Sequence, residues 1–268
     1  MSDSPVARAF AEERRTAIMS TLEKTASVQV ADLAKTFDVS TVTIRTDLDA
    51  LERAGKLRRT HGGAVSLHKR LTVSVQDQRV NVNVAAKQAI ARAAIELVED
   101  GDSLLIDSGT TALEFVRMLD LRQNITVITA DITIADYIDE SLPGVDVILL
   151  GGTLRKGHRY LYGPLTIAGV RALHPDKAFI CPISLVPKRG FMTNYEQMAE
   201  VKTAFLQVAR TSIALVDAAK IDASGLIQFA GINEVDAIVM DRDPEGAVTQ
   251  TVAELPEGTP RPRVIVAG

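Results

Sequence analysis

Polar side chains and glycines that could bind an anion follow several apolar runs in this chain. The run 103–106 is followed by Asp107-Ser108-Gly109-Thr110-Thr111, which opens a predicted helix. Such a turn offers free backbone N–H groups, hydroxyl groups and the positive end of a helix dipole to an anion. Arg155 follows Gly151-Gly152 after a later run, and a guanidinium group can form two parallel hydrogen bonds with a phosphate. These residue types predict a site for a phosphorylated small molecule, with the candidate residues Asp107, Ser108, Gly109, Thr110, Thr111, Asp131, Gly151, Gly152, Arg155 and Lys220.

Each of these residues also has a structural interpretation. Asp107 and Asp131 could simply cap helices, and Gly151-Gly152 could simply form a turn. Arg155 and Lys220 could be solvated surface residues. Groups that could bind a phosphate follow three of the predicted strands. Because they occur together, the combination favours a ligand site over separate structural roles.

A second set of residues, between positions 28 and 65, could contact DNA. Val30, Leu33 and Phe37 recur at helical spacing, and Ser40 or Thr41 can cap a second helix that Gly55 ends. The N-terminal residues of such a second helix face base edges in the major groove, where an arginine can bind guanine. The second helix takes its predicted apolar stripe from Val42, Ile44, Leu48 and Leu51. The residues predicted to contact DNA are Thr41, Thr43, Arg45, Thr46, Arg58, Arg59 and His61.

The layout of this segment is that of a winged helix-turn-helix, in which a short basic strand and the turn at Gly62-Gly63 follow the second helix. Glycine at these positions permits a turn or the close approach of a neighbouring backbone. The alternative interpretation is a small helical bundle with a solvated basic edge that never touches DNA.

The rest of the chain alternates between short apolar runs and helical patterns. A helix is predicted from Val84, with Ala85, Ile90, Ala94 and Val98 on its buried face. Continuous apolar runs separated by helices are typical of a mainly parallel sheet covered on both faces, which makes the fold class α/β. The predicted strands are 103–106, 125–129, 145–150, 178–181, 212–216, 237–240 and 264–267, and the predicted helices between them include 111–119, 132–138, 165–173 and 196–210.

Composition predicts two domains and separates them by charge. We expect a DNA-binding domain at 1–65, a linker at 66–82 and an α/β domain at 83–268. Residues 1–70 hold 12 Lys and Arg against 9 Asp and Glu, whereas the remainder holds 18 against 25, so a basic segment precedes an acidic body. No apolar run is long enough to span a membrane and no signal segment precedes the first domain, which predicts a cytoplasmic protein. Cys181 is the only cysteine, which excludes an intramolecular disulfide and a multi-cysteine zinc site, and neither a metal nor a cofactor is predicted.

Residues 12–65 resemble the N-terminal domain of DeoR-type bacterial transcriptional regulators. One departure is Thr46, because the family usually carries a second basic residue directly after the arginine of the second helix. The loss of one ionic phosphate contact predicts a weaker dependence of DNA binding on salt. The residues that carry the resemblance are Glu13-Arg14-Arg15, Ile18, Val30, Asp32-Leu33-Ala34, Val39-Ser40, Thr43-Ile44-Arg45, Asp47-Leu48, Leu51, Gly55 and His61-Gly62-Gly63-Ala64.

Residues 84–241 resemble the C-terminal sensor domain of the same family, which is related in fold to ribose-5-phosphate isomerase. The resemblance implies a repressor that a phosphorylated sugar or sugar-derived effector releases from its operator. Two departures lie near the site: Ile180-Cys181-Pro182-Ile183-Ser184 replaces a glycine-rich turn, and Met198 replaces a glutamate. The matching residues are Asp107, Gly109, Thr110, Thr111, Thr129, Gly151, Gly152, Arg155, Gly163, Pro164, Phe179, Gly190, Lys202, Asp217, Lys220 and Asp241.

The sequence therefore predicts a sequence-specific transcriptional regulator, most simply a repressor of carbohydrate-metabolism genes, that is not an enzyme. Its predicted partners are double-stranded operator DNA and a phosphorylated effector. At least a dimer is expected, as a homodimer or homotetramer, because one small DNA-binding domain has limited area and affinity. Two alternatives remain: a sugar-phosphate isomerase with a DNA-binding appendage, and an interaction module whose sensor no longer binds a ligand. His158, Arg159, Tyr160 and Tyr162 either form a surface loop, the interpretation favoured here, or supply alternative ligand contacts.

Overall fold

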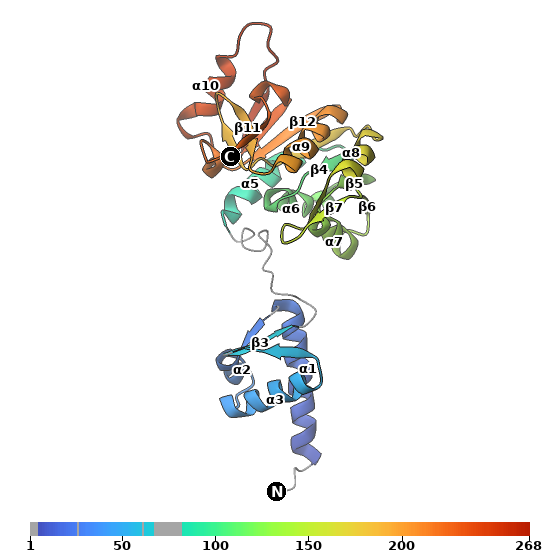
Figure 1. Ribbon diagram of the computed structural model, residues 1–268. Helices are drawn as coiled ribbons and strands as arrows, with labels where there is room; N and C mark the ends of the chain where they lie inside the picture. Colours follow the sequence, from blue (N-terminus) through green and yellow to red (C-terminus); the bar gives the residue numbers. More distant parts are fainter. Residues whose placement is uncertain (1–4, 26, 61, 67–81) are drawn as a thin grey trace. The chain divides into compact units, whose positions relative to one another are not determined.

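The computed structural model describes residues 5–25, 27–60, 62–66 and 82–268. The chain divides into two compact units, Met1–Val73 and Ser74–Gly268 (Figure 1). The division lies inside the predicted linker, and most of that linker lies outside the described residues. Within the described residues, no helix has both the length and the apolar character needed to cross a membrane.

The first unit is built from helices and a small antiparallel sheet. A helix absent from the prediction, α1 (Pro5–Thr25), precedes the two expected helices α2 (Val30–Thr36) and α3 (Thr41–Arg53). The sheet has three strands in the order β1-β3-β2, so it contains one strand more than the predicted hairpin. Its strands are β1 (Ser27–Gln29), β2 (Leu57–Arg59) and β3 (Gly63–Ser66).

Local sequence explains the bounds of α3. The Ser40 hydroxyl group accepts a 3.1 Å hydrogen bond from the Thr43 backbone N–H, which confirms the predicted cap. Gly55, at φ +67°, follows the end of the helix in the left-handed conformation, also as predicted. The backbone of Val28 approaches Gly63 so closely that a Cβ atom there would lie 1.8 Å from the Val28 carbonyl oxygen, so only glycine fits at this position.

The core of the first unit lies between the three helices and the sheet. Ile44, Leu48 and Leu51 of α3 are buried there, together with Leu33 of α2. The predicted apolar stripe was wrong at one residue, Val42, which is 66% exposed. Val42 lies two positions before Ile44, about 200° around the helix, and therefore points away from the core.

The second unit contains a seven-stranded sheet in the order β15-β14-β12-β9-β4-β5-β6, and every strand pair in it is parallel. This confirms the predicted fold class. The order reverses between β4 and β9, because the chain runs outward from β4 to β6 and then returns to β9 beside β4. The strands are β4 (Ser103–Ile106), β5 (Ile125–Thr129), β6 (Val145–Leu149), β9 (Lys177–Ile180), β12 (Thr211–Val216), β14 (Ala237–Met240) and β15 (Arg263–Val266).

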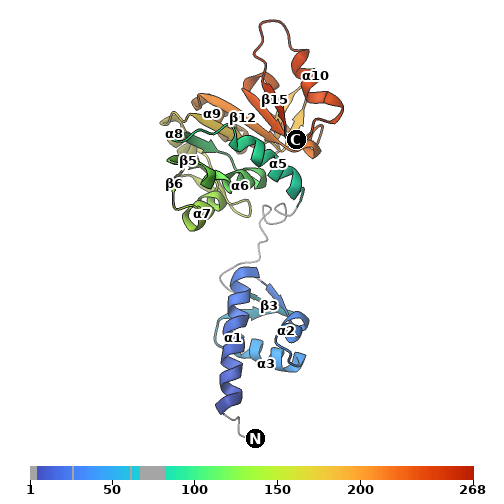
Figure 2. The same cartoon turned by 180° about the vertical axis from the view of Figure 1, so that it is seen from behind.

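Helices cover both faces of this sheet (Figures 1 and 2). On one face, Leu104 and Ile106 pack with α5 (Val84–Ile95), α6 (Thr110–Val116) and α7 (Ile132–Ser141). On the other face, Leu105 packs with α8 (Pro164–Arg171), α9 (Glu196–Val208) and α10 (Ala247–Ala253). Successive residues of a strand point to opposite faces, so one apolar run supplies both cores.

Two smaller sheets were not predicted. One is an antiparallel sheet in the order β10-β11-β13, and the other is the hairpin β7-β8. Their strands are β7 (Thr153–Arg155), β8 (Tyr160–Tyr162), β10 (Ser184–Val186), β11 (Gly190–Thr193) and β13 (Ile227–Ala230). The prediction for the long helix was also wrong at Ala85, which is exposed, and Lys87 takes the buried position two residues later.

Candidate functional site

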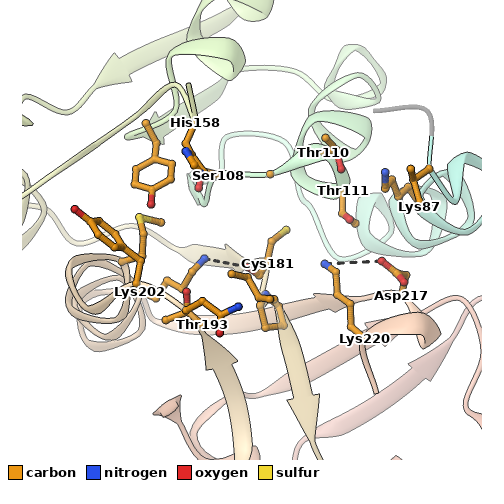
Figure 3. A pocket seen from close by; sticks show the side chains of 18 of the residues that line it. Lys87, Ser108, Thr110, Thr111, His158, Cys181, Thr193, Lys202, Asp217 and Lys220 are labelled. Atoms are coloured by element: carbon orange, nitrogen blue, oxygen red, sulfur yellow. Dashed lines mark hydrogen bonds and ion pairs between the residues drawn. The ribbon is translucent and has the colours of Figure 1, made fainter. Parts of the chain in front are cut away.

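A pocket of about 500 Å³ lies in the second unit, over the carboxyl ends of β4 and β9. Ser108 after β4 and Cys181 after β9 both line it (Figure 3). Ligands of open parallel sheets bind where the strand order reverses, because the loops from neighbouring strands diverge there and leave a crevice. A volume of this size suits a small metabolite.

Asp107 does not line the pocket but contacts three residues that do. Its carboxylate accepts 2.8 Å hydrogen bonds from the backbone N–H groups of Ser108 and Cys181, and it pairs with the ammonium group of Lys202. Lys202 also donates a 2.9 Å hydrogen bond to the Cys181 carbonyl oxygen. Asp107 is 1% exposed, so it holds β4, β9 and α9 together and is fully engaged by protein groups.

The loop after Asp107 lies in the pocket wall as the sequence predicted. Ser108, Gly109, Thr110 and Thr111 all line the pocket. Gly109 has φ +143°, a conformation that a residue with a side chain rarely adopts. The loop therefore presents two threonine hydroxyl groups and backbone groups to the same space.

One end of the pocket, here called the lysine end, carries Lys87 of α5 and Lys220 after β12. The ammonium group of Lys220 lies 3.9 Å from the Asp217 carboxylate. Asn83 donates a 3.5 Å hydrogen bond to the same carboxylate. Lys87 is buried on α5. In the sequence it only interrupts the apolar face of the helix, which does not by itself indicate a ligand contact.

The other end, here called the tyrosine end, carries Arg155, His158 and Tyr160 of the β7–β8 hairpin and Tyr195 before α9. The Arg155 guanidinium group lies 3.9 Å from the centre of the Tyr195 ring and donates a hydrogen bond to the Tyr160 hydroxyl group. The His158 and Tyr160 rings meet edge to face at 6.0 Å. Figure 3 shows His158 and Lys202 on one side of the pocket and Lys87, Asp217 and Lys220 on the other.

The favoured interpretation of His158, Arg159, Tyr160 and Tyr162 as a surface loop was therefore wrong for His158 and Tyr160, which line the pocket, whereas Arg159 and Tyr162 lie outside its lining. The hairpin turns back over the sheet, and Asp131 after β5 forms an isolated backbone bridge with Tyr160. Tyr160 is buried against the pocket. Burial raises the pKa of Tyr160 to about 12, so its hydroxyl group keeps its proton at neutral pH while it accepts from Arg155.

Besides Asp107, three further predicted ligand residues lie outside the pocket lining. Asp131 caps α7, accepting hydrogen bonds of 2.7 and 3.3 Å from the backbone N–H groups of Thr133 and Ile134. The Gly151 carbonyl oxygen accepts from the Thr166 hydroxyl group at 2.7 Å. At Gly152, a Cβ atom would lie 2.1 Å from the Thr166 Oγ1 atom. The contacts of these three residues therefore fit the structural alternatives, a helix cap for Asp131 and a turn for Gly151-Gly152. Arg155 and Lys220, in contrast, line the pocket.

Other pocket residues were not singled out as ligand contacts. Lys87 and Tyr195 gave no motif, and Thr193 belongs to the unpredicted strand β11. Met198, which stands where the family usually has a glutamate, is buried in the wall. Burial raises the pKa of the Cys181 thiol to about 11, so Cys181 is a neutral wall residue at physiological pH.

The charges of the pocket favour an anion. Its lining contains Lys87, Arg155, Lys202 and Lys220 but only one carboxylate, that of Asp217. Lys202 is neutralised from below by Asp107, which leaves an excess of positive charge at both ends. Among the described residues, no group of three or more His, Cys, Asp or Glu side chains could hold a metal ion.

In the first unit, the exposed face of α3 carries most of the predicted DNA contacts. Thr41, Arg45 and Thr46 are exposed, and Thr43 is half-buried. The Thr43 hydroxyl group lies 2.9 Å from the Ser40 hydroxyl group. The Thr46 hydroxyl group donates a 3.0 Å hydrogen bond to the Val42 carbonyl oxygen. Val42 is also exposed, so its methyl groups add an apolar surface to this face of α3.

The basic residues after α3 differ in their surroundings. Arg59 is held by Asp49 of α3, with 3.0 Å between Nε and the carboxylate oxygen, and its backbone N–H donates to Glu52 at 2.7 Å. Arg58 lies in β2. His61, also predicted to contact DNA, lies outside the described residues. Arg59 would have to exchange its Asp49 partner for a phosphate in order to bind DNA.

Buried charges orient α3 within the first unit. Asp47 on the inner face of α3 is 2% exposed and accepts from the Nε atoms of Arg14 at 2.6 Å and Arg15 at 2.9 Å. Both arginines belong to α1, so this ion pair fixes one helix against the other. Asp47 therefore has a structural role, whereas its neighbours Arg45 and Thr46 face outward.

Comparisons with known proteins cover almost all of the described chain. Residues 14–70 match the DeoR-like helix-turn-helix domain, and residues 82–242 match the DeoR C-terminal sensor domain. The chain is 32% identical to the transcriptional repressor AccR of Agrobacterium fabrum, over 96% of this chain and 97% of that protein. It is also 32% identical to the HTH-type transcriptional repressor GlcR of Bacillus subtilis, over 89% of this chain and 91% of that protein.

A comparison of structures finds ribose 5-phosphate isomerase A of Methanocaldococcus jannaschii, at a TM-score of 0.39 and 17% identity. The match covers 52% of this chain and 55% of the isomerase. A likeness at this level carries no argument about function.

Proposed function

Because this chain belongs to the DeoR family of helix-turn-helix transcriptional regulators, we propose that it represses carbohydrate-metabolism genes and is released from DNA by a phosphorylated sugar-type effector. The observation that carries the proposed effector class is the excess of positive charge in the pocket of the second unit. Lys87, Arg155 and Lys220 line a space that also offers threonine hydroxyl groups for a polyol. The site of action is the cytoplasm, where the operator DNA is.

The proposed DNA interface is the exposed face of α3 with the strands that follow it. Arg45 would read guanine, Val42 would contact a thymine methyl group, and Thr41 would contact a base edge or a phosphate. Arg58, Arg59 and His61 are proposed phosphate or minor-groove contacts. Two copies of this interface would bind two half-sites, so the regulator acts as a dimer or a tetramer.

The proposed mechanism is thermodynamic linkage between the two units. The protein has one state that fits the operator and one that does not. An effector can lower operator affinity at most by the factor by which it binds the second state more tightly than the first. Asp107 supports this role indirectly, because it ties the pocket loop to β9 and α9, and a ligand on that loop acts on all three. Ser108, Gly109, Thr110 and Thr111 are the proposed phosphate contacts on the loop.

The isomerase alternative is not retained, since the chain belongs to a family of regulators. The pocket is consistent with this: Asp107 is engaged by Lys202 and two backbone groups, and Met198 stands where a carboxylate would otherwise lie. The third alternative, a sensor without a ligand, is separated from the proposal by experiment.

The test is a thermal-shift screen of the full chain against phosphorylated sugars and their unphosphorylated parents. A ligand at 100 times its dissociation constant stabilises the native state by about 2.7 kcal/mol, a shift that is easily measured. We expect the phosphorylated compounds, but not their unphosphorylated parents, to raise the melting temperature. DNA that this protein selects from a random pool then serves in a gel-shift assay, in which the most stabilising compound should reduce the fraction of bound DNA. If no compound shifts the melting temperature, or if a stabilising compound leaves DNA binding unchanged, the proposed effector class is wrong.

A further inference from the structure

The two ends of the pocket differ in how their positive charge is compensated. At the lysine end, Lys220 lies near the Asp217 carboxylate, and the Asn83 amide group also contacts that carboxylate. At the tyrosine end, Arg155 forms no ion pair with any carboxylate of the described residues. Its polar contact is the neutral hydroxyl group of Tyr160. A guanidinium group without a carboxylate partner is available to an acidic group of a ligand.

Arg155 is held in one orientation before any ligand arrives. The Tyr195 ring covers one face of the guanidinium group at 3.9 Å, and the Tyr160 ring centre lies 5.6 Å away. The Tyr162 and Tyr195 rings meet edge to face at 5.7 Å, which supports Tyr195 in turn. Fixing a flexible arginine in advance lowers the entropy cost of binding and favours bidentate recognition of a carboxylate or phosphate.

The two ends of the pocket arise from parts of the fold that are separated across the sheet. Lys220 follows β12, whereas the hairpin that carries Arg155 is bridged to Asp131, directly after β5. In the sheet, β12 and β5 are separated by β9 and β4, which places the two backbones about 14 Å apart. Figure 3 likewise shows Lys87 and Lys220 across the pocket from His158.

We propose that the effector carries two acidic groups: a phosphate at the lysine end and a second one, carboxylate or phosphate, that binds Arg155 at the tyrosine end. The inference rests on the proposed function, since it concerns the ligand of the same pocket. Met198 contributes by its chemistry, because a thioether in the pocket wall adds no negative charge at a position where the family usually has a glutamate. The ligand class is a sugar-acid phosphate or a sugar bisphosphate.

The test compares ligands of equal length that differ at one end. Calorimetry of the full chain would measure glucitol 6-phosphate against 6-phosphogluconate, ribitol 5-phosphate against 5-phosphoribonate, and fructose 6-phosphate against fructose 1,6-bisphosphate. We expect the second acidic group to tighten binding at least about tenfold in the pair whose length fits, the size of a charge-assisted hydrogen-bonded contact.

Substitutions assign that gain to Arg155. In Arg155→Gln, we expect the difference between the two members of the pair to shrink to about twofold or less, while affinity for the monophosphate is kept. Lys220→Gln should weaken both members equally. Arg210→Gln, which removes a guanidinium group that is 82% exposed on the surface, is the matched control and should change neither. Arg155→Lys separates charge from geometry, because it keeps the charge without the fork.

The outcomes distinguish this inference from the proposed function. If monophosphates bind but a second acidic group adds nothing at any length, the two-anion ligand is wrong and the sugar-phosphate sensor stands. The same conclusion follows if Arg155→Gln weakens the monophosphate as much as its acidic counterpart. If no phosphorylated probe binds, both proposals are overturned together.

Discussion

Single residues of one chemical type have different roles in this protein, and their surroundings assign those roles. Lys202 and Asp107 neutralise each other in the interior, whereas Arg155 faces the pocket with no carboxylate partner among the described residues. On α3, Asp47 is buried between two arginines, while Asp49 lies outside and holds Arg59. Burial and partners therefore separate structural charges from binding charges more clearly than residue type does.

The Asp107–Lys202 pair predicts a stability effect that is separable from ligand binding. Asp107→Ala leaves the ammonium group of Lys202 buried without its carboxylate, which should cost about 3–5 kcal/mol in urea unfolding. The double variant Asp107→Ala/Lys202→Met should lose less than the sum of the two single variants, by about 0.5–3 kcal/mol. Strict additivity of the two effects would contradict the pairing.

Arg45 predicts a change in DNA specificity. Arg45→Ala removes an exposed guanidinium group from α3 and should weaken binding to selected operator DNA by about 1–3 kcal/mol, with little effect on scrambled DNA. Arg53→Ala, at the last turn of the same helix, is the matched loss of charge. Fluorescence anisotropy at one fixed salt concentration measures both. Should Arg45→Ala keep the wild-type preference for the operator, the assigned base contact is wrong.

Thr46 predicts the dependence of DNA binding on salt. Thr46→Arg adds a charge on the exposed side of α3, where the family usually has a basic residue. The slope of log K against log salt should steepen by about 0.9, the value for one added phosphate contact. An unchanged slope would show that position 46 does not reach the DNA backbone.

At the scale of elements, tight backbone approaches hold the pocket walls in place. The turn between β6 and β7 brings Gly152 against Thr166 of α8 and against the backbone of Tyr162 in β8. This turn sets the direction of the hairpin that carries Arg155 and Tyr160. The glycine pair therefore influences the pocket through geometry, although neither glycine lines it.

The two neighbouring glycines offer a matched test. Gly152→Ala should destabilise the second unit by about 3 kcal/mol or more, because the new Cβ atom would meet the Tyr162 carbonyl oxygen at 2.7 Å and the backbone has φ +149°. Gly151→Ala places its Cβ atom in open space and should stay within about 1 kcal/mol of the wild type. Thermal unfolding measures both, and equal effects would refute the structural role of Gly152.

At the scale of the whole molecule, the chain joins a DeoR-like helix-turn-helix domain to a DeoR C-terminal sensor domain. The comparisons show the DeoR family over both units, and the pocket and α3 each present exposed groups suited to a negatively charged partner. Linkage requires that the coupling between two such sites be reciprocal.

Reciprocity gives a prediction for the full chain. If an effector lowers operator affinity by a given factor, saturating operator DNA should lower effector affinity by the same factor, expected between about 5-fold and 150-fold. Titration of effector with and without operator DNA, at equal salt, measures both sides of the cycle. An effector whose affinity does not respond to operator would rule out allosteric release.

The sequence by itself determined the strands of the parallel sheet and the helices α2 and α3, but not α1 or the two smaller sheets. Apolar runs and helical spacing located all seven strands of the parallel sheet within one residue at each end, together with α2 and α3, because side-chain periodicity depends only on neighbouring residues. The loop 107–111 was recognisable for the same reason, since a glycine turn before a helix is a local signal.

Only the tertiary structure decided which of these elements meet. The return of the chain from β6 to β9 beside β4 brings Lys202 to Asp107 across 95 positions, and the hairpin brings Tyr160 and Arg155 over the end of the sheet. Tertiary packing also brought Gly152 against Thr166 of α8 and the backbone of Tyr162 in β8. Contacts between distant residues depend on how the strands are ordered and twisted, which local periodicity does not encode.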